Sequence, residues 1–275
     1  MADFFNEIAN MFSYSFMVRA IFIGGMVALC AALLGVILVL KRYSMIGDGL
    51  SHVSFGAMAI GLAFNQAPLY VAIPVVIVAA YLLLRVSENS KIKGDAAIGL
   101  ISSSSIAIGI IVNTLSKGTN IDLNSYMFGS ILAIGKDDSI LCIVLGIIIL
   151  VGFIYFYHYI FAITFDENFA KATGIKVEIY KTLLAVLTAL TIVIGMRIMG
   201  TLLISSLIIF PAVTSMRLFK KFKSVLAASV VVAMISYFTG MTASYMLEIP
   251  SGASIVVCNL IIFIVAGIIS KIKRG

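Results

Sequence analysis

The segment FMVRAIFIGGMVALCAALLGVILVL (16–40) decides the fold, because it runs for 25 residues with Arg19 as its single charge. A helix that crosses a membrane needs about 20 predominantly apolar residues. A secretory signal peptide would begin with a basic region, but here Asp3 and Glu7 precede the first basic residue. We therefore expect the segment to be kept as a membrane-crossing helix.

Apolar runs of similar length continue to the end of the chain. The further candidates are 46–64, 68–86, 96–115, 139–163, 180–197, 199–216, 224–247 and 252–270. Only Arg197, Ile198 and Met199 separate 180–197 from 199–216, so these two segments form either a tight hairpin or a re-entrant pair. The sequence thus predicts an all-α integral membrane protein, a polytopic bundle of eight or nine transmembrane helices, with residues 1–275 forming one domain.

The composition supports a lipid environment. Of the 275 residues, 62% are hydrophobic and 11% are charged, whereas a soluble domain has about 25% charged residues. The net charge of +7 is expected at the cytoplasmic helix ends, so we predict no nucleic-acid partner. Cys30, Cys142 and Cys258 lie far apart in apolar runs, which favours packed thiols over a disulfide or a thiolate metal site.

The basic residues predict an orientation. With nine crossings and the N-terminus outside, fifteen of the 19 Lys and Arg residues fall in the cytoplasmic connections. The four on the other side are Arg19, Lys117, Lys136 and Arg197. This asymmetry follows the positive-inside rule and predicts a cytoplasmic C-terminus.

Two connections are longer than turns. Residues 116–138 fall outside and contain a short apolar stretch that we expect to lie along the membrane surface. Residues 165–181, FDENFAKATGIKVEIYK, fall inside and mix acidic, basic and small residues. We expect this segment to form a short exposed helix.

Asp48 and His52 are the residues most suited to chemistry. Asp48 is the acidic residue that falls within a predicted helix, in MIGDGLSHVSFG (45–56). A carboxylate in the membrane costs about 3 kcal/mol on insertion scales, so it is rare and usually functional. His52 follows four residues later, and residues at this spacing share one helix face. Carboxylate and imidazole are both ligands for Zn²⁺ and Mn²⁺.

A structural interpretation of the same pair is that Asp48 caps the start of the second helix and His52 hydrogen-bonds to it. Zinc usually takes four ligands, so one pair is two short. A two-fold dimer would supply a second Asp48 and His52. The other histidine, His158, lies among Tyr155, Tyr157 and Tyr159, which is typical of an interfacial aromatic belt.

Two absences from the sequence bear on function. No G-x-x-x-x-G-K-[ST] phosphate loop occurs, so ATP hydrolysis would require a separate chain, for which 165–181 is the candidate docking segment. No Gly-x-Ser-x-Gly elbow occurs, and the run Ser102 to Ser105 suits close helix packing. We therefore expect a transport protein and not an enzyme.

Taken together, four stretches resemble the permease subunits of bacterial metal-ion ABC importers, the zinc/manganese/iron family. They are RYSMIGDGLSHVSFGAMAIG (42–61), NSYMFGSIL (124–132), FDENFAKATGI (165–175) and MRIMGTLLISSLIIFPAVTS (196–215). The resemblance implies a type II ABC importer fold in the bacterial cytoplasmic (inner) membrane. It also implies a permease dimer with two cytoplasmic ATP-binding subunits and an extracytoplasmic metal-binding protein.

The resemblance also assigns residues. It makes Asp48 and His52 the metal contacts, with Zn²⁺, Mn²⁺ or Fe²⁺ as transported substrate and no permanently bound cofactor. It places the ATPase-coupling helix at about 166–175. The coupling residues it implies are Asp166, Glu167, Phe169, Ala170 and Gly174.

The metal and the transport class keep alternatives. Manganese and iron members tend to have Leu-Pro-Gly after the histidine segment, whereas this chain has Val-Ser-Phe-Gly at 53–56, so the zinc branch is favoured. The alternatives are a manganese or iron permease, and a secondary metal transporter or channel, which often has several buried charges. An importer for cobalamin or an iron chelate is disfavoured, because Asp48 and His52 suit a bare ion.

Overall fold

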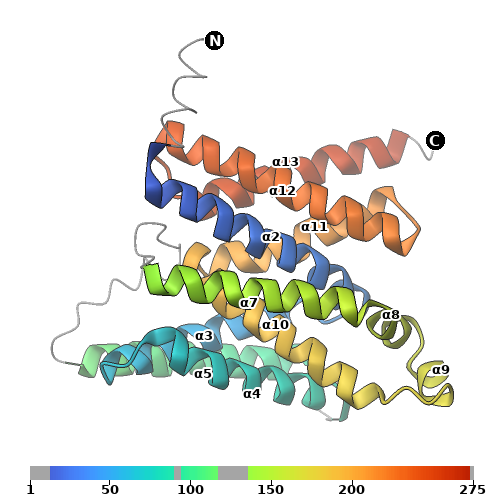
Figure 1. Cartoon of the computed structure of the whole chain (residues 1–275), viewed down its shortest axis with the longest axis horizontal. Coiled ribbons are helices and arrows are strands. Elements are labelled where there is room, and N and C mark those ends of the chain that lie inside the picture. Colours follow the sequence, from blue (N-terminus) through green and yellow to red (C-terminus); the bar gives the residue numbers. More distant parts are fainter. Residues whose placement is uncertain (1–12, 90–93, 117–135, 273–275) are drawn as a thin grey trace.

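The computed structural model describes residues 13–89, 94–116 and 136–272, and these residues form helices joined by short connections (Figure 1). The helices are α2 (Ser15–Leu40), α3 (Ile46–Ala63), α4 (Pro68–Asn89), α5 (Gly94–Leu115), α7 (Lys136–Tyr155), α8 (Tyr157–Phe165), α9 (Glu167–Ala172), α10 (Val177–Met199), α11 (Thr201–Leu218), α12 (Phe222–Leu247) and α13 (Ser251–Ile272). The predicted surface stretch and the motif at 124–132 lie outside the described residues.

Eight of the described helices are long and apolar enough to cross a membrane: α2, α4, α5, α7, α10, α11, α12 and α13. The remaining predicted segment, 46–64, forms α3, which has 18 residues and carries Asp48, His52, two serines and several glycines among its apolar residues. The predicted all-helical bundle of eight or nine segments is therefore confirmed. Both members of the 180–216 pair are full-length helices, so the re-entrant alternative is not realised.

The helices differ in how deeply they are enclosed. In α2 and α10, 72% and 78% of the most apolar window is buried, against 22–28% in α4, α5, α7 and α13. The first two therefore form the centre of the chain. The outer four present Ile, Leu and Val side chains on their free faces, as expected for contact with lipid.

Small residues bring α3 against α5. A Cβ atom at Gly56 would lie 2.6 Å from the carbonyl oxygen of Ser105, and one at Gly49 would lie 2.7 Å from the side chain of Ile98. Ser102 is buried and donates to the Ile98 carbonyl. Ser102 and Ser105 of the serine run therefore lie in the close contact with α3, whereas Ser103 and Ser104 are exposed.

The predicted single helix at 139–163 is divided at Phe156, which separates α7 from α8. The chain turns there toward an aromatic cluster, in which Tyr157, Phe161 and Phe165 of α8 all contact the ring of Phe222 at the start of α12. This packing, which apolar periodicity does not reveal, turns α8 away from the axis of α7 (Figure 1).

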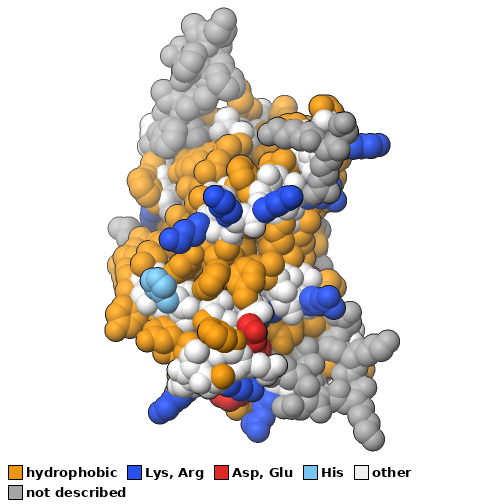
Figure 2. Space-filling view, turned by 90° about the vertical axis from the view of Figure 1, so that its right-hand side faces the viewer, with side chains coloured by type: hydrophobic (Ala, Val, Ile, Leu, Met, Phe, Trp, Pro, Cys, Tyr) orange, Lys and Arg blue, Asp and Glu red, His pale blue; other side chains and the backbone are white. Residues whose placement is uncertain are grey.

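The two ends of the bundle differ in what they carry. At one end lie α8, α9 and the last turn of α13, on the right in Figure 1, whereas α2 begins at the other. Figure 2 looks onto the α8–α9 end and shows Lys and Arg side chains at many places and few acidic ones. At the opposite end, Arg197 of α10 pairs with Asp138 of α7 at 2.9 Å.

Candidate functional site

Asp48 and His52 lie on one face of α3, one turn apart. The helix begins at Ile46 with Met45 as its N-cap, so Asp48 lies in the first turn and does not cap the helix. His52 Nε2 lies 3.6 Å from Asp48 Oδ2. The predicted convergence of the two side chains is therefore present, and an acidic group in the first turn is also favoured by the helix dipole.

Ser205 of α11 completes the local arrangement. Its hydroxyl is within hydrogen-bonding distance of two acceptors. These are Asp48 Oδ1, at 3.3 Å, and the carbonyl oxygen of Thr201, at 3.2 Å. The hydroxyl therefore orients the carboxylate from the opposite side to His52. Sequence reasoning did not single out Ser205, because the contact joins positions 157 residues apart and nothing in the local pattern says which face of α11 meets α3.

The pair is open although the helix around it is enclosed. From Ile46 to Ala59, the side chains of α3 are buried except those of Asp48 and His52. The side chain of Asp48 is 40% exposed and that of His52 is 21% exposed. Leu202, one turn before Ser205 on α11, is also exposed. In a single chain, the carboxylate of Asp48 and the imidazole of His52 are therefore partly exposed.

The other candidate ligands do not join this pair. Among the described residues, no three His, Cys, Asp or Glu side chains gather closely enough to hold a metal ion. His158 is exposed on α8 and stacks edge-on against Tyr157, consistent with the aromatic-belt prediction. Cys30, Cys142 and Cys258 are free thiols.

The cytoplasmic segment predicted at 165–181 contains the short helix α9. Asp166 is its N-cap, and its carboxylate accepts a hydrogen bond of 2.9 Å from the backbone N–H of Phe169. Ala170 is fully buried against Ile163 and Val177, whereas the ring of Phe169 is 66% exposed. After the helix, Gly174 has φ +84°, a conformation that favours glycine. The α9 helix therefore packs on the bundle through Ala170 and presents Phe169 outward.

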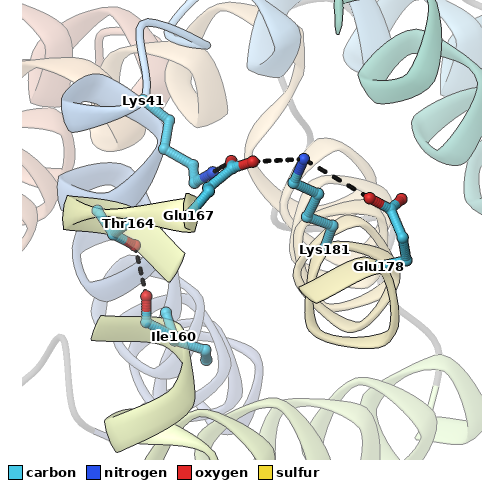
Figure 3. Close-up of polar contacts among 6 residues, drawn as sticks. All are labelled: Lys41, Ile160, Thr164, Glu167, Glu178 and Lys181. Carbon is cyan, nitrogen blue, oxygen red and sulfur yellow. Dashed lines mark hydrogen bonds and ion pairs between the residues drawn. The ribbon is translucent and has the colours of Figure 1, made fainter. Parts of the chain in front are cut away.

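Glu167 fixes α9 to the ends of two spanning helices. Its Oε1 contacts the ammonium group of Lys41 at the end of α2, and its Oε2 lies 2.7 Å from Lys181 Nζ of α10 (Figure 3). Both lysine side chains are nearly buried, at 7% and 13% exposure. Burial alone would raise the pKa of Glu167, but the hydrogen bonds from Lys181 and Lys41 outweigh it and lower the pKa.

These two lysines were expected only as cytoplasmic charges of the positive-inside pattern. Lys41 and Glu167 are 126 positions apart, so the sequence could not pair them. Residues 165–181 contain three acidic and three basic residues, and this pattern does not say which cation lies close to which carboxylate.

Comparisons with known proteins agree with this architecture. The high-affinity zinc uptake system membrane protein ZnuB of Haemophilus influenzae is 31% identical over 248 residues, which cover 90% of this chain and 95% of that protein. The manganese import system permease protein ScaB of Streptococcus gordonii is 30% identical, covering 97% of this chain and 96% of ScaB.

A solved structure is also similar. It is that of PsaBC from Streptococcus pneumoniae in complex with Fab, with a TM-score of 0.84 and 30% identity, covering 95% of this chain and 94% of the matched chain. The family model of the ABC 3 transport family matches residues 13–270. That match runs from the start of α2 to all but the last two residues of α13, and the chain therefore belongs to the ABC 3 transport family.

Proposed function

We propose that this chain is the membrane-spanning permease subunit of an ATP-driven importer that carries a divalent metal ion, with zinc as the favoured substrate. The observation that carries the proposal is the open Asp48–His52 pair on an otherwise buried helix. A carboxylate and an imidazole are costly to keep in a membrane protein without a charged or polar partner. A passing cation would supply that partner.

The donor set fits a transition-metal ion. Carboxylate oxygen and imidazole nitrogen bind Zn²⁺ at about 2.0–2.2 Å. One chain offers two such donors, held 3.6 Å apart. A second copy of the chain, placed with its own Asp48 and His52 across a two-fold axis, would raise the number of ligands to four. The exposure of both side chains in the single chain is what such a shared site requires.

Zinc is favoured because His52 is followed by Val-Ser-Phe-Gly at 53–56, where manganese and iron members of the family tend to have Leu-Pro-Gly. The relatives include proteins named for zinc uptake, for manganese import and for probable iron transport, so manganese and iron are the alternative substrates. Imidazole suits zinc and iron, whereas a preponderance of carboxylates suits manganese. One imidazole per carboxylate therefore favours zinc or iron over manganese on chemical grounds.

Three further parts complete the proposal. Separate cytoplasmic ATPase subunits dock on α9, where Phe169 is exposed and Glu167 ties the helix to α2 and α10. An extracytoplasmic metal-binding protein delivers the ion at the opposite end. The chain lies in the bacterial inner membrane with its N-terminus outside, which is supported by the basic side chains at the α8–α9 end (Figure 2).

Metal uptake tests the proposal. The chain is expressed with its cognate ATPase and binding protein in cells that lack their own importers, and accumulation of zinc, manganese and iron is compared. We expect zinc uptake to be lost in His52→Ala and Asp48→Ala. His158→Ala is the matched control, because it removes the other histidine, which is exposed on α8, and it is expected to transport normally. Unchanged zinc uptake in both site variants would refute the assignment, and uptake confined to manganese or iron would change the substrate.

A further inference from the structure

A cavity lies at the α8–α9 end of the bundle, away from Asp48 and His52. Its volume is about 740 Å³, and it is lined by residues from the end of α2, the end of α4, the α9 helix and the start of α10. Its lining includes the ion-paired Lys41, Glu167 and Lys181. Arg85 of α4 and Lys171 of α9 also line it.

The charges that line this cavity do not balance. Four basic side chains face two acidic ones, Glu167 and Glu178, which leaves a net charge of +2. Glu167 is shared by Lys41 and Lys181. Among the side chains that the structure describes, Arg85 and Lys171 have no carboxylate within 4.0 Å. These two cations are therefore available to an anion.

A hydrogen bond to Tyr81 orients the guanidinium of Arg85. Its Nη1 donates a hydrogen bond of 3.2 Å to the hydroxyl of Tyr81, one turn earlier on α4. The remaining N–H groups of the guanidinium stay free for a second acceptor. A guanidinium fixed in this way suits the tetrahedral oxygens of a phosphate, which it binds with two parallel hydrogen bonds.

Exposed apolar side chains lie on the same face of α4 as Arg85. Val78, Tyr81 and Leu82 are 58%, 39% and 49% exposed. With Arg85 they share one face of α4, because their positions differ by three, four and seven. An acyl chain can lie along this face while its head group reaches Arg85. Free phosphate would make no use of this apolar face.

We propose that this cavity binds the phosphate group of an anionic phospholipid, with Arg85 and Lys171 as its ligands and the α4 face as the seat of an acyl chain. Basic pockets between transmembrane helices on the cytoplasmic side are suited to anionic head groups. The bound phosphate would lie next to Glu167 and Lys181, so the lipid would join α4 to α9 at the point where α9 is anchored.

Binding of fluorescent phosphatidylglycerol to the full-length chain in mild detergent tests this. Unlabelled phosphatidylglycerol, phosphatidylcholine and inorganic phosphate serve as competitors. Removing both cations in Arg85→Gln/Lys171→Gln is expected to weaken binding on the order of 30-fold, which is about 2 kcal/mol at about 1.4 kcal/mol per tenfold. The matched control is Lys220→Gln/Lys223→Gln, which removes the exposed Lys220 that follows α11 and the exposed Lys223 in the first turn of α12, and it is expected to bind as the natural chain does.

A second variant is expected to strengthen lipid binding. Glu178 is 78% exposed and lines the cavity, so Glu178→Gln removes a repelling charge without disturbing the core and is expected to tighten binding several-fold. The proposal is overturned if both double variants weaken binding equally, because the charge would then act diffusely. It is also overturned if phosphatidylcholine or inorganic phosphate displaces the probe as well as phosphatidylglycerol does.

Discussion

The carboxylate of Glu167 contacts the ammonium group of Lys41, which places α9 directly against the residue that follows α2. From Lys41 the chain passes through a short turn into α3, where Asp48 lies in the first turn. The segment proposed to dock the ATPase is therefore connected to the proposed ion ligands through one ion pair and a few residues of backbone.

Replacing Glu167 with Gln is expected to destabilise the chain. The substitution leaves the nearly buried ammonium groups of Lys41 and Lys181 without their carboxylate, and a hydrogen bond to a charged group contributes about 1.5–3 kcal/mol. Thermal unfolding in detergent at neutral pH should show a lower midpoint. Glu178→Gln, which removes a more exposed carboxylate 3.9 Å from Lys181, should change it far less.

The effect of Glu167→Gln should depend on pH. Because the pKa of Glu167 is lowered in the folded chain, its contribution to stability is complete above its unfolded pKa of about 4.3 and is lost as the pH falls through the folded pKa. The gap in midpoint between the natural chain and the variant should stay constant from about pH 8 to about pH 5 and close below about pH 4. A gap that persists in acid would mean that the ion pairs do not account for it.

Ser205→Ala is expected to weaken the ion site without abolishing it. The hydroxyl is a partner of the proposed ligand Asp48 and not itself a proposed ligand, and loss of such partners costs about 10–100-fold in metal affinity. Because the bond is long, at 3.3 Å, we expect about tenfold. The concentration dependence of zinc uptake measures this, with exposed Ser104→Ala on α5 as the control. Equal behaviour of the two variants would exclude a positioning role for Ser205.

Gly56→Ala is expected to separate α3 from α5. The added Cβ would lie 2.6 Å from the carbonyl oxygen of Ser105, so the helices must shift, at a cost of about 1–3 kcal/mol. Gly99 of α5 is the matched control, because a Cβ there meets nothing within 4 Å, and Gly99→Ala should be neutral or slightly stabilising. Thermal unfolding in detergent compares them, and equal midpoints would show that α3 and α5 adjust without cost.

Phe169→Ala is expected to weaken binding of the ATPase subunit while leaving the fold intact. The ring is 66% exposed on α9, and truncation of an aromatic anchor at an interface costs about 2 kcal/mol or more. Quantitative co-purification of the ATPase subunit tests this. Phe219→Ala removes another exposed ring, between α11 and α12, and should retain the partner; loss in both variants would remove the docking role from α9.

Much of the architecture follows from the sequence because lipid allows few solutions. A run such as 16–40 must satisfy its backbone internally, so its helix could be predicted from its composition alone. The break at Phe156 could not, because it depends on aromatic contacts with Phe222, far along the chain. The proximity of Asp48 and His52 could be predicted because one helical turn joins them, whereas the contacts of Ser205 and Lys41 with their partners join distant segments.

The outward position of Asp48 and His52 has a consequence for the life of a newly made subunit. Two ligands on an open helix face bind an ion far more weakly than four that surround it, so a monomer would bind little zinc. On the proposed function, a subunit still waiting for its companion would neither withdraw scarce ions from the cell nor leak them across the bilayer. Strong capture would begin only when assembly brings the two halves face to face.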